Sequence, residues 1–213
     1  MMASCHTPVA PGYYVYPSTD RIRRLRKNIL ELVLSEYPPE RLIPEPGMLP
    51  TEFQTVVAAA GSPEVRYHLN VTHHEKDRSR PYVWSDLTEC IKCYRCVRAC
   101  DELQAEHVLG IYGRGDDSRI IKGFDQSFRD SPCVSCGACV QTCPTNALHD
   151  RYSVKTLKAD RIVRTTCTYC GVGCNLDVKV ADGQVRGIQA PLDSATNRGH
   201  TCVKGRYAFE FYN

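Results

Sequence analysis

The sequence predicts an α+β protein in which an N-terminal helix and an irregular connector precede two small cysteine-rich modules, the second rich in β-strands. Three observations predict this class: an amphipathic stretch near the N-terminus, a proline-rich stretch after it, and the concentration of 12 of the 13 cysteines beyond residue 89. We expect residues 1–79 to form the N-terminal region, residues 80–152 the first module and residues 153–213 the second module.

Residues 20–36 are predicted to form the N-terminal helix, with Ser18, Thr19 or Asp20 as its N-cap. Apolar side chains recur at helical spacing and define the face that we expect to be buried: Ile22, Leu25, Ile29, Leu32 and Val33. The helix also carries five basic residues: Arg21, Arg23, Arg24, Arg26 and Lys27. Such a run is usually a solvated helix face, and a docking surface for an acidic partner is the alternative.

Two further segments complete the N-terminal region. Residues 38–66 contain six prolines and are expected to form a connector around one short helix near residues 52–60. Residues 13–16, with the sequence Tyr-Tyr-Val-Tyr, are expected to be partly β-like.

Twelve cysteines form three groups of four, with spacings typical of iron–sulfur ligands. Two groups share the spacing C-x2-C-x2-C-x3-C, and the third reads C-x2-C-x3-C-x27-C. A cubane needs four thiolates around one small volume, and in the two-cluster bacterial pattern the last cysteine of each run binds the other cluster. Three separate quartets predict a protein that carries electrons.

We therefore predict three [4Fe-4S] clusters with the following ligands. Cluster A is assigned to Cys90, Cys93, Cys96 and Cys143, and cluster B to Cys133, Cys136, Cys139 and Cys100. The third cluster is assigned to Cys167, Cys170, Cys174 and Cys202. Zinc is the main alternative, more so for the third group than for the first two, because zinc sites also use C-x2-C pairs. Disulfides are disfavoured by the odd cysteine count and by the lack of a secretory segment.

Local sequence predicts how the chain connects these cysteines. The glycine-containing segment between the first two runs is expected to form a surface loop or hairpin. Residues 161–165 are expected to form a strand that leads to Cys167, and residues 176–180 and 184–188 a hairpin around the turn Ala181-Asp182-Gly183. The hairpin and a turn near residues 197–199 would return the chain to Cys202.

Charge and hydropathy exclude some partners. A net charge of +3 is too small to indicate nucleic acid or a membrane surface, and no apolar run approaches the roughly 20 residues of a membrane span. The Arg23-Arg24 pair is followed by charged residues rather than by an apolar signal core, so we expect a cytoplasmic protein. Residues 151–213 are locally basic, with ten Lys or Arg against five Asp or Glu.

Residues 80–210 resemble the catalytic (alpha) subunits of formate dehydrogenases. Two segments resemble the start of their molybdopterin oxidoreductase domain: Arg164-Thr-Thr-Cys-Thr-Tyr-Cys-Gly-Val-Gly-Cys174 and Cys202-Val-Lys-Gly205. Three further segments resemble the electron-relay region of those subunits: Cys96-Val-Arg-Ala-Cys100-Asp-Glu, Gly113-Arg-Gly115 and Ser131-Pro-Cys-Val-Ser-Cys-Gly-Ala-Cys139. This resemblance implies a ferredoxin-like fold.

The N-terminus resembles the same family in an eroded form. Residues 3–9 look like the end of a [2Fe-2S] domain in which Cys5 would be the last ligand, and we expect Cys5 to be a free thiol. The next motif of the family, one His and three Cys, has no counterpart here, and Tyr37 stands at the expected histidine position. We expect His73 and His74 to be surface or loop residues rather than replacement ligands.

The resemblance implies an iron–sulfur electron-transfer subunit, or a fragment, of a formate dehydrogenase-like oxidoreductase. It places Lys204 between the third cluster and a molybdenum or tungsten bis-pterin cofactor in a catalytic partner subunit, and the basic residues 151–213 would suit the pterin pyrophosphates. Electrons would pass to a flavin/NAD or ferredoxin-linked partner, and no catalytic residue is expected in this chain. The alternative is a relay subunit of a hydrogenase or a complex I-like assembly.

Overall fold

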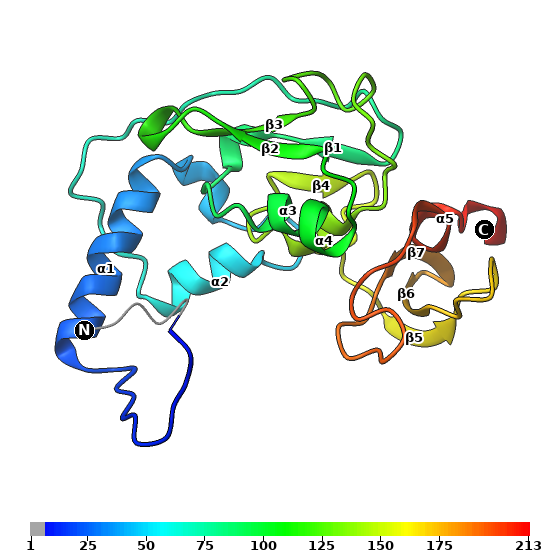
Figure 1. Cartoon of the computed structure of the whole chain (residues 1–213), viewed down its shortest axis with the longest axis horizontal. Helices are drawn as coiled ribbons and strands as arrows, with labels where there is room; N and C mark the ends of the chain where they lie inside the picture. Colours follow the sequence, from blue (N-terminus) through cyan, green and yellow to red (C-terminus); the bar gives the residue numbers. More distant parts are fainter. Residues whose placement is uncertain (1–6) are drawn as a thin grey trace.

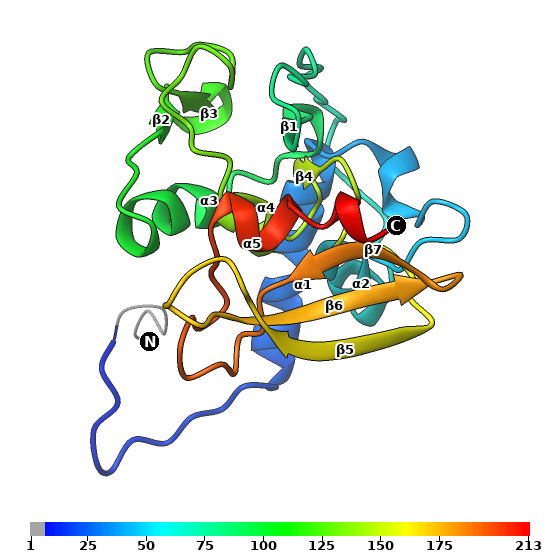
Figure 2. The same ribbon diagram turned by 90° about the vertical axis from the view of Figure 1, so that its right-hand side faces the viewer.

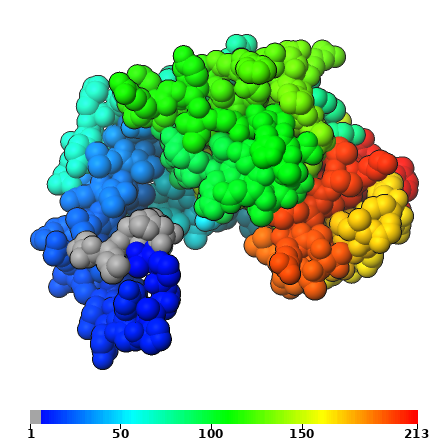
Figure 3. Space-filling model, viewed as in Figure 1, coloured from blue at the N-terminus to red at the C-terminus, as the bar shows by residue number. Residues whose placement is uncertain are grey.

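A computed structural model describes residues 7–213 and shows three regions that follow one another along the chain. In Figure 1 an N-terminal helical region (blue to cyan) lies on one side of a central module (green), and a three-stranded sheet (yellow to red) lies on the other. The space-filling view in Figure 3 shows the same order. Cys5, expected to be a free thiol, lies outside the described residues. Within residues 7–213, no helix is long and apolar enough to cross a membrane.

The N-terminal region contains the two expected helices, α1 (Asp20–Ser35) and α2 (Glu52–Ala59), with a 3₁₀ turn η1 (Pro39–Leu42) between them. The Thr19 hydroxyl accepts a hydrogen bond from the Ile22 amide at 3.3 Å and caps α1. Thr51 and Gln54 form a capping box at the start of α2. Both helices therefore begin where local capping chemistry predicts.

The predicted buried face of α1 is wrong for most of its length. Leu25, Ile29 and Leu32 are 41%, 60% and 50% exposed, because only the last turns of α1 pack against α2. The side chains that form this small core are Leu34, Tyr37, Phe53 and Val57. The expected β-like segment at residues 13–16 is also wrong: it forms no strand, and its side chains are exposed because no neighbouring strand pairs with it.

The central module is closed by a short ladder between β1 (Val83–Ser85) and β4 (Leu148–Asp150), which pair antiparallel with Val83 opposite Asp150. Between them lie the 3₁₀ turn η2 (Leu87–Glu89), helix α3 (Arg95–Arg98), its π-helical continuation η3 (Ala99–Leu103) and helix α4 (Ala138–Thr142). The expected hairpin is present as β2 (Leu109–Tyr112) and β3 (Arg119–Lys122), joined through η4 (Gly115–Asp117).

The last region is an antiparallel sheet with strand order β5 (Arg161–Thr166), β6 (Asn175–Ala181) and β7 (Gln184–Gln189). The turn between β6 and β7 uses Asp182 and Gly183, both with positive φ, as the Asp-Gly sequence predicts. Helix α5 (Val203–Tyr207) and the turn η5 (Glu210–Tyr212) follow. Figure 2 shows the three strands side by side, with α5 next to β7.

Candidate iron–sulfur sites

The structure brings Cys90, Cys93, Cys96 and Cys143 together around one small cavity, named cavity A here. The first three come from the loop after η2 and the start of α3, and Cys143 follows the end of α4. About 340 Å³ of space lies between the atoms, lined otherwise mainly by apolar side chains such as Ile120 and Leu148. Four thiols around an apolar space match the donor set of a [4Fe-4S] cluster.

A second cavity, cavity B, repeats this arrangement with Cys100, Cys133, Cys136 and Cys139. Its space of about 360 Å³ is lined by Val83, Leu109 and Phe128 among others. Helices α3 and α4 pack against each other, so the cysteine at the far end of each helical segment reaches the cavity of the other run. The cysteine sets around the two cavities are thus the crossed sets that the spacing predicts.

The two loops that carry the first three thiols of each set have the same backbone conformation. Lys92 and Ser135, at matching positions, have φ values of 53° and 55°. Tyr94 and Gly137, also matching, have φ values of 58° and 75°. These left-handed residues coil each loop tightly around its cavity, and they cost about 1 kcal/mol or more for a non-glycine residue. The first loop therefore carries this strain at both positions and the second only at Ser135, because Gly137 adopts a positive φ freely.

Backbone amides donate to one sulfur near the start and one at the end of each run. The Lys92 and Ser135 amides lie 3.4 Å from Cys90 Sγ and Cys133 Sγ, respectively. Cys100 Sγ accepts from the Val108 amide at 3.3 Å, and Cys143 Sγ from the Leu148 amide at 3.4 Å. Hydrogen bonds to sulfur favour the thiolate and raise the reduction potential of a bound cluster. These donors are missed by sequence reasoning because backbone amides carry no residue signature.

Burial raises the pKa of three thiols in each of the first two cysteine runs, Cys90 and Cys139 among them. The pKa of Cys90 rises to about 11, with its neighbour Cys143 also raising it and the Lys92 amide opposing the rise. The pKa of Cys139 lies well above its ordinary value, first because of burial and then because of the nearby thiols. Without metal these thiols carry protons at neutral pH, so binding iron as thiolate ligands must release them.

The third cysteine group lies at the edge of the three-stranded sheet. Cys167 follows β5 and Cys174 precedes β6, and the Cys167 amide donates to the Cys174 carbonyl at 2.7 Å. Cys202 is the N-cap residue of α5. Burial raises the pKa of Cys174, and the Cys167, Cys170 and Cys202 thiols are close enough to raise it further. All four predicted residues therefore lie in the same region, and Cys170 and Cys202 are exposed.

Lys204 lies in the first turn of α5, two residues after Cys202, with its side chain exposed. His73 is exposed and His74 half-buried in an irregular segment. Within residues 7–213, no three His, Cys, Asp or Glu side chains converge closely enough to hold a single metal ion.

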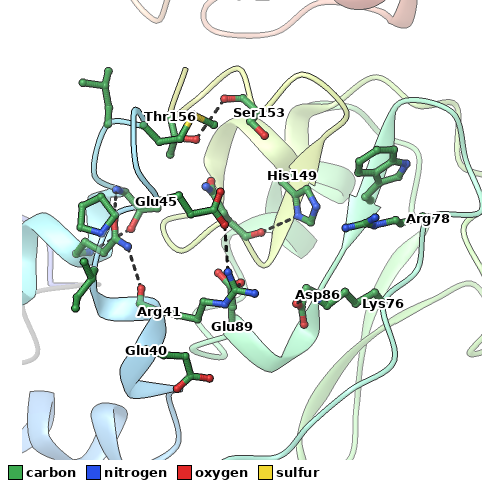
Figure 4. A pocket seen from close by; sticks show the side chains of 18 residues that line it. Glu40, Arg41, Glu45, Lys76, Arg78, Asp86, Glu89, His149, Ser153 and Thr156 are labelled. Carbon is green, nitrogen blue, oxygen red and sulfur yellow. Dashed lines mark hydrogen bonds and ion pairs between the residues drawn. The ribbon is translucent and has the colours of Figure 1, made fainter. Parts of the chain in front are cut away.

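Another cavity lies between the N-terminal region and the central module and is lined by several charged side chains (Figure 4). Its cations are held by neighbouring acids: Arg41 contacts Glu45 at 3.2 Å and Glu89 at 3.3 Å, and Lys76 contacts Asp86 at 3.0 Å. The His149 imidazole is close to the Asn146 carbonyl at 3.0 Å. These pairs stabilise the junction between the N-terminal region and the central module.

Between cavity B and the third group the structure places a buried cation that the sequence did not reveal. Arg206 in α5 is 1% exposed, and its Nε donates to the Cys136 carbonyl at 2.9 Å. Tyr207 beside it is 2% exposed. Neither residue lies in a recognisable motif, because its burial depends on how α5 packs against the central module.

The fold and its cysteine groups define an iron–sulfur protein of the oxidoreductase class, and comparisons with known proteins agree. Residues 80–149 match the ferredoxin-like domain of NADH-quinone oxidoreductase subunit 3. Residues 160–213 match the molybdopterin oxidoreductase Fe4S4 domain. The two segments belong to these domain families, and the predicted resemblance is confirmed.

Curated relatives cover the whole chain. A subunit of the NADH-quinone oxidoreductase of Rhizobium meliloti is 31% identical over 99% of this chain and 25% of its own length. A candidate formate dehydrogenase of Staphylococcus haemolyticus is 27% identical over 99% of this chain and 25% of its own length. The chain thus spans about a quarter of the relatives it matches.

Among solved structures, an NAD⁺-reducing [NiFe]-hydrogenase in the H2-reduced state is similar to this chain. It has a TM-score of 0.60 and 27% sequence identity, over 70% of this chain and 64% of that chain. Together the domain matches and relatives confirm the prediction of an iron–sulfur electron relay of an oxidoreductase complex.

Proposed function

We propose that this chain relays electrons through three [4Fe-4S] clusters in a formate dehydrogenase-like molybdenum or tungsten oxidoreductase. The ligand sets are those predicted from the sequence for clusters A and B and for the third cluster. The observation that carries the proposal is the meeting of eight thiols around cavities A and B in crossed sets of four. A cluster in each cavity would be held by both halves of the central module.

The contacts between the regions support one spatial order for the relay. The third group is joined to cavity B by α5, which begins at Cys202 and reaches the Cys136 carbonyl through Arg206. Cavity A lies on the opposite side, where Lys92 forms an ion pair with Glu36 of the N-terminal region at 2.7 Å. Electrons would therefore pass from the third cluster to cluster B and then to cluster A.

The exposed third group would face the metal–pterin part of the assembly. Cys170 and Cys202 are exposed, and Lys204 is exposed beside them. A catalytic partner with a molybdenum or tungsten bis-pterin cofactor would cover this surface, with Lys204 between the two redox centres. At the other end, cluster A would deliver electrons to a flavin/NAD or ferredoxin-linked partner. A bound cluster supplies one-electron chemistry, and this chain supplies burial, amide donors and position.

A second function is favoured by specific matches. The ferredoxin-like segment matches a domain of NADH-quinone oxidoreductase subunit 3, and the similar solved structure is a hydrogenase. Under this alternative the same three clusters would relay electrons in a hydrogenase or complex I-like assembly, without a metal–pterin partner. Both functions use the same cluster sites. They differ in the partner at Lys204, which is a metal–pterin subunit only in the first function.

Elemental analysis of the chain, purified without oxygen with its bound partners, tests the proposal. We expect about twelve iron and twelve sulfide per chain from three cubanes, with molybdenum or tungsten in the same complex. The same iron content with nickel, or with neither pterin metal, would favour the alternative assembly. Zinc in place of iron would refute the relay. A Cys139→Ala variant should lose about four iron atoms, while a Cys5→Ala variant should lose none.

A further inference from the structure

Arg206 is a buried cation with most of its hydrogen-bonding capacity unused. Its side chain is among the largest fully buried ones in residues 7–213. Nε donates to the Cys136 carbonyl, whereas neither Nη1 nor Nη2 has a hydrogen-bond partner among the described residues. A buried charge without a counter-charge costs several kcal/mol. An anionic group close to Arg206 would offset this cost.

The buried acid in this region, Asp150, interacts electrostatically with Arg206 but forms no hydrogen bond with its guanidinium. Asp150 is 1% exposed, and its Oδ1 accepts from the amides of Tyr152 and Val154 at 3.0 and 3.1 Å. Its Oδ2 has no hydrogen-bond partner in the described part of the chain. The hydrogen bonds that Asp150 accepts therefore come from the backbone of the turn after β4.

The other feature against Arg206 is the loop of cavity B. A Cβ atom on Gly137, between Cys136 and Ala138, would lie 2.6 Å from Arg206 Cδ and 2.7 Å from its Nε. Glycine at this position lets the guanidinium approach the loop backbone. A [4Fe-4S] cluster held by four thiolates is anionic and becomes more negative on reduction, so it would add a second counter-charge for a guanidinium that Asp150 approaches without a hydrogen bond.

We propose that Arg206 is the positioning residue that sets the reduction potential of cluster B and links α5 to it. The inference rests on the proposed function, because it requires a cluster in cavity B. A fixed positive charge in a poorly solvated site stabilises the reduced cluster more than the oxidised one. Arg206 therefore raises the potential of cluster B and favours electron transfer to it from the third cluster, whose ligand Cys202 begins the same helix.

The test is an anaerobic redox titration of the full chain, monitored by electron paramagnetic resonance and paired with iron analysis. The signal of cluster B is the one absent from Cys139→Ala. At a fixed applied potential, Arg206→Met should lower the ratio of reduced to oxidised cluster B by about tenfold, which is about 59 mV for one electron. Arg206→Lys keeps the charge and should restore most of the ratio.

Lys179→Met is the matched control, because Lys179 is a buried cation of β6 whose Nζ donates to the Val154 carbonyl at 2.6 Å. It should leave the potential of cluster B unchanged. Full iron content with an unchanged ratio in Arg206→Met would overturn the proposal but not the relay. If Arg206→Met loses iron, Arg206→Lys and Arg206→Gln are compared instead. Equal ratios of reduced to oxidised cluster B in these two variants would overturn the proposal. Wild-type protein without iron–sulfur clusters would overturn both.

Discussion

Tyr82 and Tyr207 stack across the boundary between the central module and α5, with ring centroids 4.8 Å apart and an interplanar angle of 4°. Tyr82 immediately precedes β1, and Tyr207 is the last residue of α5. Tyr207 is also part of the core that contains Cys96, Cys139 and Cys143. The stack therefore holds the third cysteine group against the two-cluster region.

Removing this stack should loosen α5. Tyr207→Ala is expected to destabilise the protein by about 3 kcal/mol through lost burial and the cavity it leaves. Tyr207→Phe should be neutral or slightly stabilising, because the Tyr207 hydroxyl is buried and has no hydrogen-bond partner among the described residues. Anaerobic urea unfolding followed by circular dichroism measures both. A Phe variant as unstable as the Ala variant would show that the hydroxyl has a role we have missed.

Gly137 should tolerate no side chain. Its φ is 75°, and a Cβ would lie 2.5 Å from Tyr207 Oη as well as against Arg206. Gly137→Ala is expected to cost about 2–4 kcal/mol and to reduce iron content. Gly115→Ala is the control, because Gly115 has a φ of 57° and open space around it. It should cost only about 1 kcal/mol, and equal losses would mean that crowding at Gly137 is unimportant.

Asp77 should stabilise the β2–β3 hairpin through its charge. It accepts from the Phe128 amide at 2.7 Å and pairs with Lys122 at 2.8 Å. Burial raises its pKa, but Lys122 and Ser79 outweigh that effect and lower the pKa to about 2. Because the folded-state pKa lies below the unfolded one, the stabilisation is present above about pH 4 and is lost as pH falls toward 2.

Asp77→Asn should therefore destabilise the protein by about 1–3 kcal/mol, equally at pH 5 and pH 7. Thermal unfolding at both pH values measures this difference. Asp20→Asn is the control, because the Asp20–Arg23 pair is exposed and such pairs contribute little. A loss that appears at pH 7 and vanishes at pH 5 would contradict the assignment.

Removing iron should unfold the regions unequally. The core of the central module contains Cys96, Cys139 and Cys143. Because these are proposed cluster ligands, the packing of this core should depend on the bound clusters. The sheet β5–β7 has a separate small core of Leu176, Ile188 and Phe209. After chelation under oxidising conditions, hydrogen exchange should accelerate within residues 83–150 and change less in β6 and β7. Uniform acceleration would show that the sheet needs the clusters too.

The apolar residues of α1 should differ sharply in how much they contribute to the free energy of unfolding. Leu34→Ala is expected to cost about 2–4 kcal/mol, because Leu34 is 3% exposed and packs in the core with Phe53. Leu25→Ala should change stability by less than about 0.5 kcal/mol. Thermal unfolding of the two variants measures the contrast. Similar losses would indicate that the exposed face of α1 is covered in solution.

The sequence was most informative where structure depends on short-range spacing. The cysteine runs, the Asp182-Gly183 hairpin and the Thr19 cap depend on residues within a few positions of one another. The crossing of Cys100 and Cys143 was predicted from the two-cluster bacterial pattern, in which the last cysteine of each run binds the other cluster.

Long-range packing was less predictable. Helical periodicity indicated which side chains share a face of α1. It did not indicate how much of that face α2 and the connector at residues 38–66 would bury. The burial of Arg206 depends on the docking of α5 some 70 positions after Cys136 along the chain. Two of the four amide-to-sulfur hydrogen bonds come from Lys92 and Ser135, whose backbone is left-handed, and a glycine at these positions would have been a clearer signal.

The ladder between β1 and β4 has a consequence for how such proteins are assembled from parts. Because Val83 lies opposite Asp150, the chain enters and leaves the two-cavity unit at almost the same point. A unit with adjacent ends can be inserted into a host chain, or removed from it, while the flanking segments keep their separation. The ladder therefore brings the two ends of residues 83–150 side by side, between the N-terminal region and the sheet that follows.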